Sequence, residues 1–291
     1  MAAGSDGPLM GGGSDGSLMA GGSDGSDGPL MFVRYAYPPN ALGYCGPDDV
    51  AALRKYAVTG VADPGVARLA QAFSGAWPYL EAIADGCGIG DPLDQRVVEA
   101  YWVGNDLLEQ MPATGIGAEM AARFRAQAGG KFSFQAEGPL AGGVPHHSFH
   151  VFGVYPWVGL LSNERTARHA LMVLDRCMIR WGQVTEVLGE QVCVEYQPLA
   201  WDGQRLSLGE PTQETARLAQ DGVVLARDTG PGDGVAPGGG VAPGDWVALH
   251  WDWVCDKLTG HQLDALRGYT RRHLDMVNQR AEHPGTATVP G

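Results

Sequence analysis

Three histidines fall close together in the segment Pro145-His146-His147-Ser-Phe-His150. On an α-helix, His146 and His150 are four residues apart and His147 and His150 are three apart, so pairs of imidazoles converge on one side. Imidazole is a common ligand of zinc and other divalent metals. No Glu follows the first His, so the general base of the zinc-protease motif is absent. The segment therefore predicts a metal site, with helix capping and polar packing as the alternative role of these histidines.

Further ligands for that site are available elsewhere in the N-terminal half. Cys45 directly precedes an expected helix, and a helix N-terminus lowers the pKa of a thiol, which suits a ligand or a nucleophile. The alternative is a small residue in a tight turn. Asp48 and Glu99 are additional candidate ligands. Asn105, one helical turn after Tyr101, can direct a polar group into a cleft between domains.

A second pair of candidates, Cys177 and His250, lies in the C-terminal third. The segment Cys177-Met-Ile-Arg-Trp-Gly-Gln-Val184 places a cysteine ahead of a Gly-x-Val strand, and Gly244-Asp-Trp-Val-Ala-Leu-His250 ends on a histidine. These two segments resemble the hydrogenase assembly chaperones HypC and HupF, in which a cysteine begins the first strand and a histidine-bearing strand leads into a terminal helix. The resemblance covers residues 177–281.

The resemblance implies that the chain carries or assembles a metal fragment. In such proteins a cysteine thiolate, with a histidine nearby, holds an iron that bears cyanide and carbonyl ligands, so Cys177 is the implied ligand and His250 its companion. A soft thiolate suits such an iron, and imidazole is a second donor or an orienting group. The implied partners are a hydrogenase large-subunit precursor and a maturation scaffold. The alternative is a buried thiol at the start of a strand and a core histidine.

Two kinds of element must position these residues. Up to Asp175, apolar residues recur mostly at helical spacing; Asp91-Pro92 opens a helix that reaches Leu108, and Pro145 opens another. After Asp175, short alternating segments predict strands. Their ranges are 183–187, 191–196, 206–208 and 246–250. A capping box at Thr259-x-x-Gln262 predicts the start of a final helix.

The predicted fold class is α+β, with an all-helical N-terminal domain followed by a small OB-like β-barrel with a C-terminal helix. The helical domain covers 32–175 and the barrel domain 176–281. A Gly/Ser/Asp repeat over 1–31 predicts a disordered head, and 282–291 a tail. The segment 210–244, with a disordered part at about 228–244, is interpreted as a loop inserted in the barrel.

Composition excludes several classes of function. The formal net charge of −13 argues against a nucleic-acid partner, because phosphate contacts need clustered Lys and Arg. No apolar run approaches the ~20 residues that span a bilayer, and no secretory signal is evident. The 5 cysteines, an odd number, favour reduced thiols and a cytoplasmic protein. P-loop, Rossmann and nucleophile-elbow motifs are absent.

Three functions remain. The first is a hydrogenase assembly accessory protein, a chaperone or metal carrier and not an enzyme, which binds an iron fragment or the precursor through the barrel. The second is a metal-dependent enzyme with a His146/His147/His150 site that holds zinc or another divalent metal. The third is a metal-free protein-interaction module.

Overall fold

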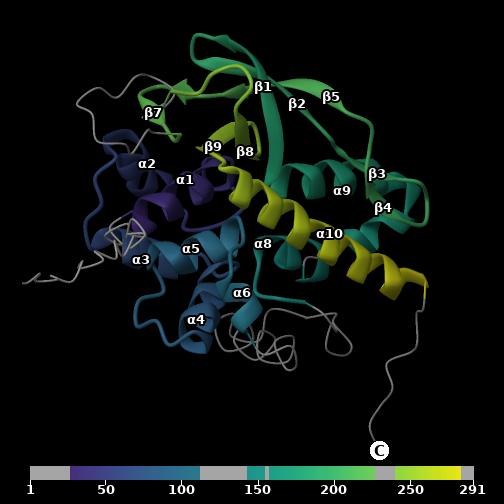
Figure 1. The fold of residues 1–291 in the computed structure, drawn as a ribbon, viewed down its shortest axis with the longest axis horizontal. Helices are drawn as coiled ribbons and strands as arrows, with labels where there is room; N and C mark the ends of the chain where they lie inside the picture. The colour runs from purple at the N-terminus through teal and green to yellow at the C-terminus, as the bar shows by residue number, and fades with distance from the viewer. Residues whose placement is uncertain (1–26, 112–142, 155–156, 227–239, 283–291) are drawn as a thin grey trace, which may run out of the picture.

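The computed structural model describes residues 27–111, 143–154, 157–226 and 240–282. The fold is mixed α+β, as predicted at that level: helices come first, a five-stranded sheet follows, and one long helix comes last (Figure 1). The earlier helices are α1 (Gly28–Ala41), α2 (Val50–Thr59), α3 (Gly65–Gln71), α4 (Trp77–Gly86), α5 (Gln95–Trp102) and α6 (Leu107–Gln110). The later ones are α8 (His147–Phe149), the π-helix η1 (His150–Val154), the 3₁₀-helix η2 (Val158–Ser162), α9 (Glu164–Cys177) and α10 (Gly260–Glu282).

Helix α1 lies at the centre of the helical part and packs against α2 and α5. It begins at Gly28, inside the segment predicted to be a disordered head, and buries Phe32 and Tyr35 completely. Arg34 pairs with Asp27 and with Asp256, which links the start of this helix to the sheet. The rest of the head, 1–26, lies outside the described residues, as do 227–239 and 283–291.

The helix expected from Asp91 to Leu108 is two helices, α5 and α6. Asp94 caps the first one, because its side chain accepts a hydrogen bond from the backbone N–H of Arg96. The chain leaves the helical conformation at Gly104, where φ is +98° and an added Cβ would lie 2.3 Å from the Tyr269 ring of α10. Only glycine combines a positive φ with room for the Tyr269 ring, so the helix breaks at Gly104.

The sheet pairs its strands in the order β1-β2-β5-β9-β8, and β8 pairs back with β1. The β5–β9 pairing is parallel and the others are antiparallel. Its strands are β1 (Arg180–Leu188), β2 (Gln191–Tyr196), β5 (Thr212–Arg217), β8 (Trp246–His250) and β9 (Trp253–Lys257). Short pairs are β3 (Leu199–Trp201) with β4 (Leu206–Leu208) and β6 (Ala219–Gln220) with β7 (Val223–Val224).

Two expectations about this part of the chain are wrong. The segment 210–244 is not merely an inserted loop, because β5 lies within it and pairs with β2 over six residues. Cys177 does not begin the first strand. It is the last residue of α9. The helix ends there because the next residue, Met178, has an extended ψ of 148°, and β1 starts only at Arg180.

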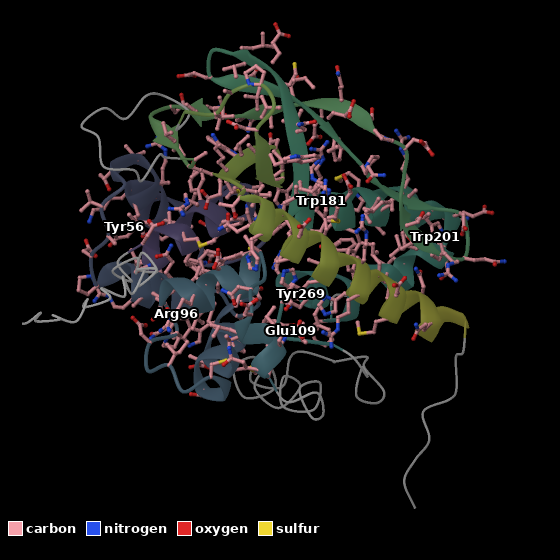
Figure 2. The ribbon with its side chains drawn as sticks, in the orientation of Figure 1. Tyr56, Arg96, Glu109, Trp181, Trp201 and Tyr269 are labelled. Atoms are coloured by element: carbon pink, nitrogen blue, oxygen red, sulfur yellow. The ribbon has the colours of Figure 1, made fainter. Side chains whose placement is uncertain are left out.

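Helix α10 begins at the predicted capping box, which the structure confirms. The backbone N–H of Gln262 donates to Thr259 Oγ1 at 3.2 Å, and Gln262 Oε1 accepts from the backbone N–H of Thr259 at 3.0 Å. In the view of Figure 1, the sheet lies on one side of α10 and α4–α6 on the other. Tyr269 of this helix donates to Glu109 of α6 at 2.8 Å (Figure 2).

The largest cluster of buried apolar side chains includes Phe32 and Trp102 from the helices, Trp253 from β9 and Leu266 from α10. A smaller cluster lies inside the sheet, around Val194. The division into domains at residue 175 stays a prediction. Among the described residues, no helix has both the length and the apolar character needed to cross a bilayer.

Candidate metal centre

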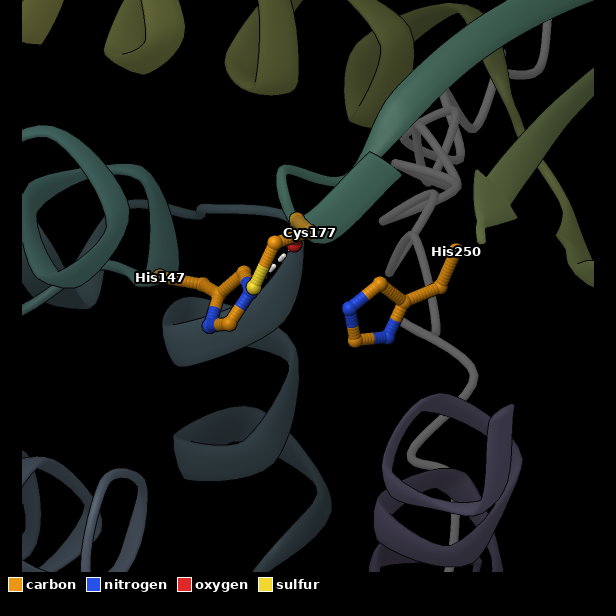
Figure 3. A group of neighbouring side chains, drawn as sticks. All are labelled: His147, Cys177 and His250. Carbon is orange, nitrogen blue, oxygen red and sulfur yellow. Dashed lines mark hydrogen bonds between the residues drawn. The ribbon is translucent and has the colours of Figure 1, made fainter. Parts of the chain in front are cut away.

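Three potential metal ligands meet where three elements end. His147 comes from the start of α8, Cys177 from the last residue of α9 and His250 from the last residue of β8. One donor atom of each, an imidazole nitrogen or the Cys177 Sγ, lies within 4.8 Å of the others. In Figure 3 one ring nitrogen of His250 points toward Cys177 and His147. We call this group the His147–Cys177–His250 cluster.

Backbone pairing holds Cys177 and His250 side by side. Strands β1 and β8 are antiparallel partners, and one further bond extends their pairing, from the N–H of Trp251 to the carbonyl of Arg176 at 2.9 Å. The residue before Cys177 is thus bonded to the residue after His250. Arg180 strengthens this junction, because its buried guanidinium donates to the Trp251 carbonyl and pairs with Glu214.

His147 is held by hydrogen bonds at both ring nitrogens. Its Nε2 lies 2.8 Å from the carbonyl oxygen of Cys177, and its Nδ1 lies 3.0 Å from the Tyr101 hydroxyl. That hydroxyl is also 3.1 Å from the carbonyl of Gly75. The Cys177 carbonyl can only accept, so this bond needs the proton on Nε2. If a metal replaces that bond, the proton can move to Nδ1, because the Tyr101 oxygen can accept from it. With the proton on Nδ1, the Nε2 lone pair is available to a metal.

His250 has one bonded and one unpartnered nitrogen. Its Nδ1 donates to the carbonyl of Tyr35 at 2.6 Å, which fixes the proton on that nitrogen in the neutral ring. Its Nε2 is buried and has no hydrogen-bond partner among the described residues. A buried acceptor without a partner costs about 1–3 kcal/mol. Burial, followed by the nearby His147, holds the pKa of His250 well below its usual value, so the ring stays neutral, as a ligand must be.

The thiol of Cys177 is protonated in the metal-free protein. Burial raises its pKa to about 12, because a thiolate loses its hydration there. Burial likewise lowers the pKa of His147 to about 4. A metal ion changes this balance at the thiol, since coordination stabilises the thiolate and expels its proton.

A cavity of about 130 Å³ adjoins the cluster. All three cluster residues line it, and so do two other sequence-predicted donors, Cys45 and His150. Most of the remaining wall is aromatic, and no Asp, Glu, Lys or Arg is among the described residues that line it. At its edge the half-exposed Tyr44 stacks on Trp251 with ring centroids 4.1 Å apart. An apolar cavity beside a few convergent polar groups is typical of ligand sites.

Four sequence-predicted residues lie away from the cavity. The helix expected from Pro145 starts only at His147, so His146 precedes it and turns toward α10, where its ring stacks on Tyr269 and its Nδ1 bonds Ser148 Oγ at 2.8 Å. Asp48 is exposed. Glu99 accepts from Gln262 at 2.6 Å and from Asn105 at 3.1 Å. Glu99 therefore links α5 to α10 through Gln262, and to the loop before α6 through Asn105.

Sequence reasoning missed three residues of this site. Tyr101 and Trp102 sit in an apolar helix, where a core role is the usual one, and nothing in the sequence gives Trp251 a role. Trp251 has a positive φ of 55°, which is uncommon for a residue other than glycine. No sequence signal marks that conformation. It places the indole of Trp251 over the cavity.

A sequence model of a family of unknown function, DUF6390, matches residues 24–284. No curated protein and no solved structure matches the chain. The resemblance of residues 177–281 to HypC and HupF is therefore wrong, because a single family model spans the helices and the sheet together. The short segments that suggested it, around Cys177 and His250, do not even share its geometry, since Cys177 ends a helix.

Proposed function

The chain belongs to DUF6390, a family of unknown function, and from its own residues we propose that it binds a divalent transition-metal ion through His147, Cys177 and His250. The observation that carries the proposal is the buried Nε2 of His250. This nitrogen has no partner and lies within 4.8 Å of the donor atoms of His147 and Cys177. A metal ion would satisfy it and repay the cost of leaving it unbonded.

The donor set favours a particular group of metals. Two imidazoles and one thiolate suit zinc, cobalt, nickel, copper or iron, whereas magnesium and calcium prefer oxygen ligands. Tetrahedral bonds of about 2.0–2.3 Å place neighbouring donor atoms about 3.3–3.8 Å apart. The 4.8 Å limit on the cluster therefore requires only a contraction of about 1 Å. Zinc fits this set without a redox partner, and iron is the alternative.

The number of ligands indicates what the metal would do. Structural zinc sites have four protein ligands, whereas catalytic ones have three and an open position. The cluster offers three, beside a cavity, so we propose a metal-dependent enzyme acting on a small molecule. Metal carriage is a second candidate, because Cys45 lines the same cavity and can close the site as a fourth ligand.

The sheet is the rigid support of the site in this proposal. Because β8 pairs with both β1 and β9, we propose that it is an OB-like β-barrel, with His250 at its edge. Hydrogenase proteins were inferred as partners only through the resemblance that the family assignment replaces, so the proposal names no protein partner.

Metal analysis of the purified full-length protein tests the proposal. We expect one zinc or cobalt(II) ion per chain, with an intense thiolate-to-cobalt absorption band. Cys177→Ser and His250→Ala should each lower the metal affinity at least a hundredfold, because each removes one of three ligands. Cys193→Ser and His169→Ala are matched controls, since both residues lie outside the cavity lining, and they should keep full occupancy. Equal occupancy in all four variants would disprove the site.

A further inference from the structure

We infer that the open position of this metal centre takes a small monoanion, which accepts hydrogen bonds from the indole N–H groups of Trp102 and Trp251. The inference rests on the metal centre proposed above and names the ligand class of that site. Both tryptophans line the cavity together with the three metal ligands. Charge, hydrogen-bonding capacity and size each point to the same kind of ligand.

The described residues that line the cavity include no charged side chain that could balance the charge of a bound metal. A divalent cation bound by one thiolate and two neutral imidazoles keeps a net charge of +1. No described residue of the lining is a carboxylate that could cancel it. An uncompensated charge in an apolar cavity is costly, so a ligand with one negative charge is favoured over a neutral molecule.

Two buried indole N–H groups of residues in the cavity wall have no acceptor in the described part of the chain. Trp102 Nε1 and Trp251 Nε1 are buried, and neither has a hydrogen-bond partner among the described residues. An indole nitrogen only donates, so what satisfies it must be an acceptor. Trp102 also packs against both imidazoles of the cluster, with ring centroids 4.6 Å from His147 and 5.7 Å from His250. Both tryptophans line the cavity that adjoins the metal ligands, so an anion bound to the metal is the acceptor that we assign to these two N–H groups.

The cavity has room for a ligand of a few atoms. The cavity of about 130 Å³ is close to the ~150 Å³ cavity that accommodates benzene. A metal-bound ion of three or four non-hydrogen atoms fits there. Azide, formate and acetate are therefore suitable probes.

A titration of the cobalt(II)-loaded full-length protein tests the inference. Addition of azide or formate should shift the visible cobalt bands with saturation at one anion per metal. Neutral acetamide at the same concentrations should leave them unchanged. Trp251→Phe and Trp102→Phe each keep the aromatic ring but remove the N–H donor. Each should weaken azide binding about tenfold or more, with unchanged cobalt stoichiometry. Trp157→Phe is the matched control, because its half-buried indole also lines the cavity but is not among the orphaned donors.

The outcomes separate this inference from the metal centre. If cobalt does not bind, the proposed function fails and the inference with it. If cobalt binds but azide and formate leave the bands unchanged, the metal centre stands and the anion site is disproved. Equal azide affinity in the Trp102, Trp251 and Trp157 variants also overturns the inference. A band shift seen with anions only after Cys45→Ser would show that Cys45 holds the fourth position, which overturns it as well.

Discussion

At the scale of single residues, the site depends on where protons lie. His147 can coordinate a metal through Nε2 only if its proton moves to Nδ1. Tyr101 permits this change, because its oxygen can accept from Nδ1 while its hydroxyl donates to the carbonyl of Gly75. A second partner of this kind fixes the orientation of a metal-bound imidazole and raises its basicity. Tyr101 is therefore a positioning residue for the cluster.

We predict that Tyr101→Phe lowers the metal affinity about 10- to 100-fold while one metal per chain still binds at saturation. A competition titration with a chromogenic chelator measures the affinity. Tyr79→Phe is the matched control, since Tyr79 stacks on Tyr101 and its hydroxyl lies 3.2 Å from Nδ1 of His150. An equal loss in both variants would mean that His150 is also a ligand.

The donor residues themselves were readable in the sequence. His147, His150, Cys177, His250 and Cys45 were all predicted as candidate ligands, and all five line one cavity. Their grouping was not readable. Helical spacing gave equal weight to the three clustered histidines, and only the start of α8 decides which ones face inward. That start depends on packing against α10, which is more than a hundred residues away in the sequence.

At the scale of elements, the outcome depended on how strongly each segment is patterned. Strands β1, β2, β4 and β8 are rich in β-branched, aliphatic or aromatic residues and were predicted. Strand β5, Thr212–Arg217, was missed, because Ala216 is its only fully buried side chain and the rest is polar. Its place in the sheet comes from pairing with β2, a long-range contact that local periodicity does not encode. Local periodicity likewise did not predict that Cys177 is the last residue of a helix.

Strand β5 also supplies an ion pair that fixes the site. Glu214 pairs with Arg180, which is 1% exposed, and with Arg176 at 2.7 Å. Removing the carboxylate leaves a buried guanidinium unpaired, which costs about 3–5 kcal/mol. We therefore predict that Glu214→Ala lowers the free energy of unfolding by that amount in urea denaturation. Metal affinity should fall too, because Arg180 holds the Trp251 carbonyl beside His250.

The control for this prediction is a second ion pair of the sheet. Asp252 pairs with Arg217 at 2.9 Å, but both side chains are more than a third exposed. Such pairs contribute about 0–1 kcal/mol, so Asp252→Ala should change stability little. A similar loss from both variants would show that burial of the Arg180 pair has no special effect.

At the scale of the whole molecule, the helices and the sheet share one core, and the cluster lies at their junction. The largest apolar cluster takes members from α1, α5, β9 and α10. His147 belongs to the helical part and His250 to the sheet. A metal ion in the proposed centre would therefore tie the two parts together.

Five histidines are buried in this shared interior. Because a buried ring resists protonation, they make the stability of the fold depend on pH. The buried histidines are His146, His147, His150, His250 and His273. Burial is the largest cause of the lowered pKa in each of them, because a charged ring loses its hydration. The pKa falls to about 3 for His146 and to about 4 for His147, from a usual value of 6.5.

The sign of the effect follows from proton binding. Between about pH 6.5 and pH 4 the unfolded chain protonates His147 and the folded protein does not, so acid favours unfolding. Each proton taken up only on unfolding contributes about 1.4 kcal/mol per pH unit, or up to about 3 kcal/mol for His147 over this range. Asp175 and Asp256 act in the opposite direction, because burial raises their pKa and the folded state holds their protons.

We therefore predict that the free energy of unfolding of the chelator-treated protein falls steeply from pH 6.5 to pH 4.5. Urea denaturation at half-unit pH intervals measures the slope. His147→Gln should reduce that slope by about one proton, because it removes one group that titrates only in the unfolded chain. His169→Gln, at an exposed histidine outside the cavity lining, is the matched substitution for comparison. Asp175 and Asp256 are present in the wild-type protein and in each variant, so their contribution cancels when the slopes are compared. A slope that His147→Gln does not alter would mean that His147 takes up its proton equally in the folded protein and in the unfolded chain, which contradicts the prediction.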